Sequence, residues 1–327
     1  MLFSKWKIKA LVQIILGTLP YGSEVNHLFQ KYITRAFSPQ SMLNSYRVQV
    51  RHVMALERRR SLRNETVLEI GPGAYSIAGV IFWLLGVRRQ YWIDLNRYFR
   101  LPLFHRYIDV LLANLHEISS DLGFNEVELH KKLTDLRNCN SEEEYFTVSA
   151  ITYFAPRDAQ TTGLANNSVD LVYSYGVLEH IPTPVLENIM HESRRILTTG
   201  GRHYHNIGLH DHFHSAGLGN GVNFLRYSDS QWKFIAGNRF AYHNRLRRSD
   251  YLTMLDRHGA HITFSEDELL DINIRELAKI RLDRKFSAYD PTDLAYSHLF
   301  IEFDFGTSRS ENSLVAPRTT GTLSNHR

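Results

Sequence analysis

Cysteine is almost absent from this sequence, since Cys139 is the only one among 327 residues. A disulfide within the chain is therefore excluded, and so is a structural zinc site built on cysteines. A chain that relies on no disulfide fits a reducing compartment. We therefore expect a cytoplasmic protein.

Long apolar runs and extended basic stretches are missing as well. No stretch approaches the roughly eighteen apolar residues of a membrane span. The net charge is only +4, and arginines cluster locally, as in residues 58–60 and 245–248. Nucleic-acid binding would need a longer basic stripe with interleaved aromatic residues, so we expect no nucleic-acid partner. With 43% hydrophobic and 22% charged residues, the chain has the composition of a soluble globular protein.

The start of the chain combines lysines with an apolar run. Three lysines lie within residues 5–9, and a mostly apolar segment follows to Leu19. Gln13 interrupts that segment and no small-x-small cleavage site follows it, which argues against a signal peptide. We interpret residues 5–19 as a basic amphipathic helix. Such a helix could make a peripheral membrane contact, although packing onto the body of the protein is the more usual arrangement.

Helical patterns fill residues 1–63, and strands begin at Thr66. The expected strands are 66–70, 91–93, 151–154, 169–174, 202–207, 260–265 and 297–305. The expected helices are 5–17, 23–36, 41–61, 75–86, 103–120, 126–136, 142–148, 184–197 and 248–258, the last with Ser249 as N-cap and Gly259 as its stop. Residues 208–244 show no clear period. Alternation of strands with helices predicts a mainly parallel sheet covered on both faces.

A glycine turn follows the first expected strand. Gly71-Pro72-Gly73 comes directly after residues 66–70, so the backbone can approach a ligand closely at a helix N-terminus. Asp94 lies 21 residues past Gly73, at the end of the second expected strand. Its carboxylate is placed to accept hydrogen bonds from both hydroxyls of a ribose. These two features suit any adenosine ligand.

Two residues beside the turn favour a cofactor without phosphates. A dinucleotide site normally has a third glycine, where this sequence has Ser76. Glu69 would repel a pyrophosphate but attract an ammonium or sulfonium group. The turn therefore fits a cationic cofactor better than a nicotinamide dinucleotide.

Five segments resemble, in order, the motifs of class I S-adenosylmethionine-dependent methyltransferases. They are Val67-Leu68-Glu69-Ile70-Gly71-Pro72-Gly73, Ile93-Asp94-Leu95, Arg157-Asp158-Ala159, residues 168–181, and residues 192–197 followed by Gly200-Gly201. The resemblance covers about residues 64–207. It implies a doubly wound α/β fold whose mostly parallel seven-stranded sheet has an antiparallel last strand, and it implies S-adenosylmethionine as the cofactor.

The resemblance also implies roles for single residues. Asp94 would bind the ribose, and Leu95 would pack on the adenine. Asp158 would accept from the adenine amino group, to which Ala159 adds a backbone amide, and Tyr175 would line the site near the methyl group. The complete set of implied cofactor-binding residues is Glu69, Gly71, Gly73, Asp94, Leu95, Asp158, Ala159 and Tyr175.

Histidines are dense beyond the last motif. Within twelve residues lie His203, His205, His210, His212 and His214. A base that takes a proton from the acceptor is the role they suggest, and His210 or His212 is our candidate. On an extended segment His210, His212 and His214 would point to one side and could bind a divalent metal, but we interpret this run as a polar loop without metal. His180, directly after the fourth strand, we interpret as structural.

The sequence therefore predicts three parts. Residues 1–63 form an N-terminal helical cap, and residues 307–327 form a flexible tail. Residues 64–306 form a Rossmann-like methyltransferase domain with a helical insertion at 97–150 and an acceptor-side segment at 208–244. The expected activity is O- or N-methylation of a small molecule or saccharide by in-line displacement. The alternatives are a catalytically inactive binding or scaffold protein with this fold, and a nicotinamide-dependent oxidoreductase.

Overall fold

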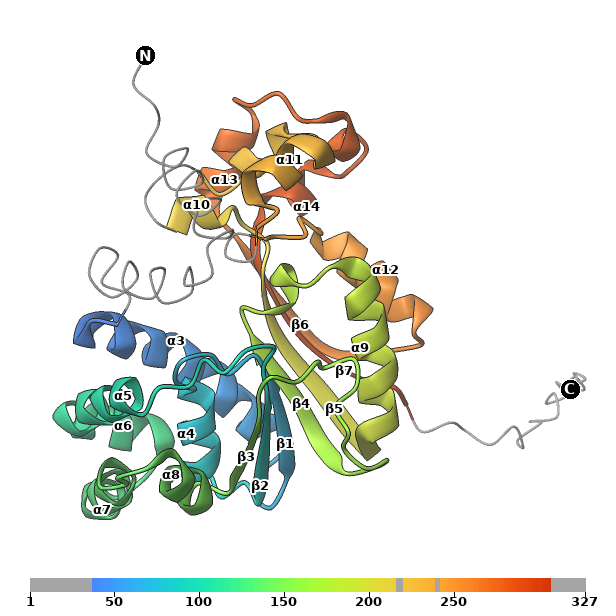
Figure 1. The fold of residues 1–327 in the computed structure, drawn as a ribbon. Helices are drawn as coiled ribbons and strands as arrows, with labels where there is room; N and C mark the ends of the chain where they lie inside the picture. Colours follow the sequence, from blue (N-terminus) through green and yellow to red (C-terminus); the bar gives the residue numbers. More distant parts are fainter. Residues whose placement is uncertain (1–36, 216–219, 239–241, 307–327) are drawn as a thin grey trace, which may run out of the picture.

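A single seven-stranded sheet organises the molecule (Figure 1). The computed structural model describes residues 37–215, 220–238 and 242–306. The strands are β1 Thr66–Ile70, β2 Arg89–Ile93, β3 Ile151–Phe154, β4 Val169–Tyr175, β5 Leu197–Gly208, β6 His261–Leu269 and β7 Tyr296–Asp304. Their order is β3-β2-β1-β4-β5-β7-β6, with β1 to β5 parallel and β7 antiparallel to both of its neighbours. The expected sheet is thereby confirmed.

Helices cover both faces of the sheet (Figure 1). One face carries α3 Pro39–Arg59, α4 Ile77–Leu84 and α5 Leu101–Ala113, and the other carries α9 Thr183–Ile196 and α12 Arg248–Arg257. The side chains of β1 alternate between the two apolar cores, with Val67 in the first and Leu68 in the second. Because both faces are covered, all five residues of β1 are buried, including the polar Thr66 and Glu69.

The stretch between β2 and β3 is helical, as predicted, but it is divided differently. It contains α5, α6 Leu115–Leu122, α7 Glu126–Arg137 and α8 Glu142–Val148. The expected single helix at 103–120 is wrong. Asn114 has a non-helical φ of −121° and donates its side-chain amide to the Val110 carbonyl at 2.8 Å. This local hydrogen bond competes with helix continuation and ends α5.

Short helices lie beyond β5, where the sequence shows no clear period. They are α10 His212–Ser215, α11 Asp229–Ala236, α13 Asp271–Leu277 and α14 Pro291–Ala295. Together with the 3-10 helices Asn223–Arg226 and Arg284–Phe286 they form what we call the helical lobe, which stands above the sheet in Figure 1. The lobe has its own apolar core, in which Phe224 and Phe286 are fully buried. Each of these helices has eight residues or fewer, which is too short for a clear amphipathic period.

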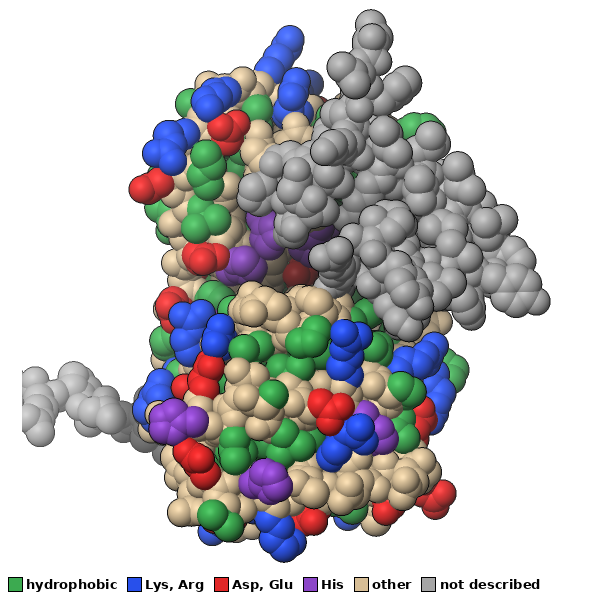
Figure 2. All heavy atoms as spheres, turned by 90° about the vertical axis from the view of Figure 1, so that its left-hand side faces the viewer, with side chains coloured by type: hydrophobic (Ala, Val, Ile, Leu, Met, Phe, Trp, Pro, Cys, Tyr) green, Lys and Arg blue, Asp and Glu red, His purple; other side chains and the backbone are tan. Residues whose placement is uncertain are grey.

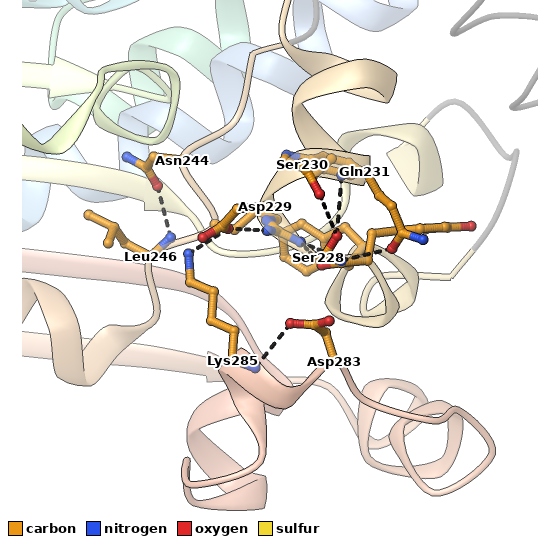
Figure 3. A network of polar contacts seen from close by, with 12 residues as sticks. Ser228, Asp229, Ser230, Gln231, Asn244, Leu246, Asp283 and Lys285 are labelled. Carbon is orange, nitrogen blue, oxygen red and sulfur yellow. Dashed lines mark hydrogen bonds and ion pairs between the residues drawn. The ribbon is translucent and has the colours of Figure 1, made fainter.

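Charged side chains join separate segments within the lobe (Figure 3). Asp229, in the first turn of α11, accepts from Arg245 at 2.5 Å and from Lys285 at 2.9 Å. Arg245 is 2% exposed and also donates to the carbonyls of Phe224 and Tyr227. The basic run at 245–248 therefore includes one arginine, Arg245, that is buried and hydrogen-bonded within the protein.

The N-terminus of α12 differs from its predicted form. The cap is Arg247, whose backbone amide donates to Asp250 at 2.8 Å, and Ser249 lies inside the helix. Ser249 Oγ instead donates to Asp293 at 2.5 Å, a partner brought by the distant segment before β7. The predicted stop is confirmed, because Gly259 has a φ of +64° directly after the helix end.

Some predictions fall on parts of the chain outside the described residues. These are the helices expected at 5–17 and 23–36, the membrane contact through 5–19 and the tail 307–327. Of the helices described, none is both long and apolar enough to cross a membrane.

Candidate active site

The turn after β1 depends on two glycines. Gly71 has a φ of +72° and Gly73 a φ of +70°, a region that other residues rarely adopt. A Cβ on Gly71 would lie only 2.8 Å from Val177 Cγ2, so the loop after β4 packs directly on the turn. Around Gly73 no atom of the described chain lies within 4 Å of such a Cβ. The turn thus leaves room at Gly73 for a ligand to approach its backbone.

Asp94 lies beside this turn, as predicted. It follows β2, and its Oδ2 accepts from the Gly73 amide at 3.3 Å. Burial raises the pKa of Asp94 to about 6, although backbone amides of residues 73, 95 and 96 oppose that shift. Leu95 projects into solvent with 62% of its surface exposed. A carboxylate and an exposed apolar side chain therefore stand next to the open side of the glycine turn.

Glu69 is held beneath the turn by Ser76. The Ser76 hydroxyl lies 2.9 and 2.7 Å from the two carboxyl oxygens of Glu69, and it also caps α4 by accepting from Gly79. Burial raises the pKa of Glu69 to about 8. The serine that replaces the third glycine of a dinucleotide motif therefore has a structural task. It anchors the carboxyl whose charge a sulfonium would favour.

Asp158 and Ala159 lie in the loop after β3, which is tied to Asp94. The backbone amide of Arg157 donates to the Asp94 carbonyl at 2.9 Å. Asp158 accepts from the backbone and side-chain amides of Gln160, both at 2.9 Å, and Ala159 is buried. The loop thus reaches the β2 end. The Asp158 carboxylate already has two donors there.

Tyr175 forms one wall of a cavity of about 510 Å³. It ends β4, and the opposite wall is the first half of α3. The α3 side is lined by Ser38, Gln40, Ser41, Asn44, Ser45, Val48 and Gln49. Six of these seven side chains carry a hydroxyl or an amide, and none carries a charge. The cavity therefore offers many neutral hydrogen-bonding groups next to the position expected for the methyl group.

The predicted histidines separate into two groups. In β5, His203 and His205 are buried, with a 3.0 Å contact between them and a 2.8 Å contact from His205 to Ser174. Burial lowers the pKa of both, that of His205 to about 3. They are part of the core. His210 and His212 instead leave the sheet and lie near each other, with ring centroids 5.1 Å apart.

The histidine run does not form the extended segment that the alternative metal-binding interpretation required. Residues 212–215 form the helical turn α10, which changes the direction of the chain after His210. The reason is local, because the Asp211 side chain accepts from the Phe213 amide at 2.9 Å and starts the turn. The side chain of His214 lies outside the described residues. The alternation of an extended strand therefore does not apply to the chain from His212 onward.

Three further histidines lie around His210 and His212. We call this group the histidine cluster, and its members are His180, His210, His212, His243 and His298. Figure 2 shows histidine side chains gathered in a hollow between the helical lobe and the body below it. His180 Nδ1 donates to the Tyr242 carbonyl at 2.6 Å, and His210 Nδ1 lies 3.1 Å from the Ser297 carbonyl. Since each proton is held by a carbonyl, Nε2 of both rings carries a lone pair.

Glu179 lies against this cluster. It is 2% exposed, its Oε1 accepts from the Gly208 amide at 3.0 Å, and burial raises its pKa to about 8. His212 Nε2 lies 3.8 Å from the same Oε1. The loop after β4 thus contacts the glycine turn through Val177 and the histidine cluster through Glu179.

Comparison with known proteins gives a family match to part of the chain and a set of similar solved structures. A family model described as a methyltransferase domain matches residues 121–205. Among solved structures, the fold is similar to geranyl diphosphate C-methyltransferase from Streptomyces coelicolor A3(2), with 12% identity, a TM-score of 0.45, and 81% of this chain and 82% of that chain covered. It is also similar to the PH0226 protein from Pyrococcus horikoshii OT3, with 12% identity, a TM-score of 0.46, and 86% and 98% covered. A search of curated proteins gave no match.

Residues 121–205 thus match a methyltransferase domain, the class of protein whose motifs the sequence resembles. The family match contains β3, β4, α9 and most of β5, whereas the glycine turn and Asp94 precede it. Those two features belong to the motifs predicted at β1 and β2, which the family match does not cover.

The sequence pattern does not single out Glu179 or His243. A signal for Glu179 is present, because Glu179 and His180 are consecutive titratable residues directly after a buried strand. Nothing in the sequence places His212 beside them, since it lies 32 residues further along the chain from His180. His243 is hidden for the same reason, because only the lobe brings it to the cluster.

Proposed function

We propose that this methyltransferase transfers the methyl group to a hydroxyl or amine of a small, polar acceptor, with a saccharide as the best fit. The cavity beside Tyr175 is the observation that supports this assignment, because six hydroxyl or amide side chains of α3 and its cap line it. Neutral donors and acceptors at close spacing suit a ligand with several hydroxyl groups. A volume of about 510 Å³ is within the range of small-molecule pockets.

Cofactor binding is assigned to the carboxyl ends of β1, β2 and β4 and to the loop after β3. Asp94 would accept from the ribose hydroxyls, and Leu95 would cover the adenine. The methionine end would lie against the backbone of Gly71 and Gly73, with Glu69 supplying a negative charge below. The remaining assigned residues are Asp158 and Ala159 at the adenine edge and Tyr175 near the methyl group.

The transfer itself is a displacement at the methyl carbon. A lone pair of the acceptor oxygen or nitrogen forms the new bond to carbon, while the carbon–sulfur bond breaks and its electrons return to sulfur. The protein mainly aligns the two partners. The acceptor proton goes to a base, for which we propose His210 or His212. His210 suits this role because its Nδ1 lies against the Ser297 carbonyl, which leaves the Nε2 lone pair to accept a proton. The His210 ring packs on His298, and His298 in turn contacts Glu268.

Calorimetry tests the cofactor assignment. S-Adenosylmethionine and S-adenosylhomocysteine are titrated into the wild-type protein, into Asp94→Ala and into Asp135→Ala, in which an exposed carboxylate on α7 is removed instead. We expect micromolar binding to the wild type and to Asp135→Ala, and no measurable binding to Asp94→Ala. A folded wild-type protein that binds neither sulfur ligand, or that binds a nicotinamide dinucleotide in their place, would contradict the proposal.

Methyl transfer from radiolabelled cofactor tests the acceptor class. Panels of saccharides, small amines and carboxylic acids are compared, with Gln49→Ala and Ser45→Ala as probes of the cavity wall. We expect saccharides to be methylated, and we expect both variants to raise KM more than they lower kcat, because they remove binding contacts away from the reacting atoms. Methylation confined to carboxylic acids, or KM values unchanged in both variants, would contradict the assignment of this cavity to a polyhydroxylated acceptor.

A further inference from the structure

Three side chains of the hollow offer ligand atoms to one point. They are Glu179, His180 and His212, and their ligand atoms all lie within 4.8 Å of one another. Two ligands bonded to one cation at about 2.1 Å cannot be more than about 4.2 Å apart. The 3.8 Å between His212 Nε2 and Glu179 Oε1 already satisfies this limit. The widest pair would need to close by less than one ångström, which a side-chain rotation can supply.

Glu179 is the observation that points to a ligand. Its side chain is buried, and its Oε2 has no hydrogen-bond partner within the part of the chain that the structure describes. A buried carboxylate oxygen without a partner costs free energy, which a bound cation would offset. Oε1 accepts from the Gly208 amide, which fixes the orientation of the carboxyl group; Oε1 keeps a second lone pair for a cation, and Oε2 is available as well.

The backbone selects which histidines can bind a cation. His180 donates Nδ1–H to the Tyr242 carbonyl, an arrangement that is usual for metal-bound histidine because it fixes the ring and leaves Nε2 as the ligand. His243 has the opposite tautomer. Its Nδ1 accepts from the Arg245 amide at 3.0 Å, so its Nε2 carries the proton and cannot bind a cation. His243 is then a donor beside the site.

We propose that Glu179, His180 and His212 bind a divalent transition-metal cation, with Zn²⁺ or Mn²⁺ as the best match. Two imidazoles and one carboxylate are ligands that both ions accept. Three protein ligands leave coordination positions open for other oxygen ligands, as in catalytic metal sites. The inference deepens the proposed function, on which its role in catalysis rests, and it goes beyond the expectation of a loop without metal.

The position of the site gives it a task in methyl transfer. Glu179 lies two residues past Val177, which contacts the first glycine of the cofactor turn. A cation held here is therefore close to the methionine end of the cofactor. It would bind an oxygen of the acceptor and lower the pKa of a bound hydroxyl. His212 is then a ligand, and the base is His210.

Metal binding alone tests the site. The full-length protein, freed of any affinity tag and treated with a chelator, is titrated calorimetrically with Zn²⁺ and with Mn²⁺. The variants are Glu179→Gln, which keeps an oxygen for the Gly208 amide, and His212→Asn. His191→Asn is the matched control, since His191 lies on α9 and packs edge-to-face against His258, with the two ring centroids 4.7 Å apart. Thermal melting shows that each variant is folded, and the visible absorption of Co²⁺ reports the ligand set.

We expect one equivalent of metal in the wild type and in His191→Asn, and binding weaker by about tenfold or more in both cluster variants. A wild type that binds no metal, cluster variants that bind as tightly as the wild type, or a loss that follows His191→Asn instead would overturn the inference. S-Adenosylhomocysteine affinity is measured on the same samples. If the protein binds S-adenosylhomocysteine but no metal, only the metal site is contradicted. If it binds metal but not S-adenosylhomocysteine, the methyltransferase proposal is contradicted.

Discussion

Two buried glutamates at the carboxyl edge of the sheet behave differently. Glu69 lies in β1 and Glu179 in the loop after β4, and burial raises the pKa of each to about 8. The Glu69 carboxyl is matched by the Ser76 hydroxyl, whereas Glu179 Oε2 has no partner within the described chain. The Glu69 carboxyl therefore finds its hydrogen-bond partner within the protein. The Glu179 carboxyl has an oxygen that a ligand would bind, which is why we assign the metal site to Glu179.

The largest effect on stability and cofactor affinity is expected where the turn after β1 packs on the loop after β4. In Gly71→Ala, the new Cβ would lie 2.8 Å from Val177 Cγ2, and the backbone would keep an unfavourable φ of +72°. Strain and overlap together should destabilise the protein by about 2–4 kcal/mol and push the loop after β4 away from the turn. We expect cofactor affinity to fall by about a hundredfold or more. Urea denaturation and calorimetry measure the two effects.

Gly123→Ala separates strain from overlap. Gly123 has a φ of +70°, but a Cβ there would meet no atom of the described chain within 4 Å. This variant should lose about 1 kcal/mol of stability and retain the wild-type cofactor affinity. If Gly71→Ala bound the cofactor as tightly as Gly123→Ala does, the close packing of the two regions would have no functional meaning.

The next effect concerns the unpartnered glutamate. Because the folded-state pKa of Glu179 is about 8 and the unfolded value is about 4.3, the folded protein binds the extra proton between these values. Its stability therefore falls as pH rises from about 4.5 to about 8. Glu179→Gln removes this penalty, so without metal it should be more stable than the wild type by about 2–4 kcal/mol near pH 8.

Denaturation at several pH values, with chelator present, measures this difference. The stability advantage of Glu179→Gln should shrink as the pH is lowered and should almost disappear near about pH 4.5. Adding Zn²⁺ should stabilise the wild type but not the variant, which would reverse their order. A stability difference that stays constant with pH would show that Glu179 does not titrate in this range.

The contrast between these regions also explains what the sequence could predict. The strands and the turn around Glu69 follow from local patterns, because β1 is a short and largely apolar run, and Gly71 and Asp94 directly follow their strands. Side chains at the ends of neighbouring parallel strands meet at one edge of the sheet. The cofactor half can therefore be assembled from short segments of the sequence, each of which carries its own pattern.

The region around Glu179 could not be predicted in this way. His212 joins Glu179 only because Asp211 starts a helical turn after β5, and His243 arrives through the lobe. The lobe helices are too short for a clear period, and Ser249 has its hydrogen-bond partner 44 residues away in Asp293. Contacts of this kind depend on tertiary packing, which a single sequence does not display.

A smaller effect tests the charge on Glu69. A bound sulfonium favours the ionised carboxyl, so S-adenosylmethionine affinity should gain from ionisation as pH rises toward about 8. Glu69→Gln keeps the size of the side chain and its contact with Ser76 but cannot ionise. We expect the ratio of wild-type to variant affinity to increase by about tenfold between about pH 6.5 and about pH 8.5.

S-Adenosylhomocysteine is the internal control for this measurement. It shares the amino group of the cofactor but has a neutral sulfur, so its affinity ratio should change much less with pH. Calorimetry at each pH gives both ratios. Equal pH dependence for the two ligands would mean that Glu69 does not respond to the sulfonium charge.

The smallest effect is expected on cofactor affinity alone, from a change at Leu95. Leu95 is 62% exposed, and the adenine ring is expected to cover it. Leu95→Ala should weaken cofactor binding about three- to tenfold, which corresponds to burying part of one apolar side chain. Stability should change by less than about 0.5 kcal/mol, because the side chain is already exposed in the free protein.

Val127→Ala is the matched control for Leu95→Ala, since Val127 is 79% exposed on α7 and lies outside both regions. It should change neither cofactor nor metal affinity. Leu95→Ala should leave Zn²⁺ affinity unchanged too, because Leu95 follows β2 whereas the metal ligands follow β4 and β5. If Leu95→Ala weakened metal binding as much as cofactor binding, the two regions would form one cooperative site. The distinction between Glu69, which is bonded within the protein, and Glu179, which we propose to bind a metal, would then be contradicted.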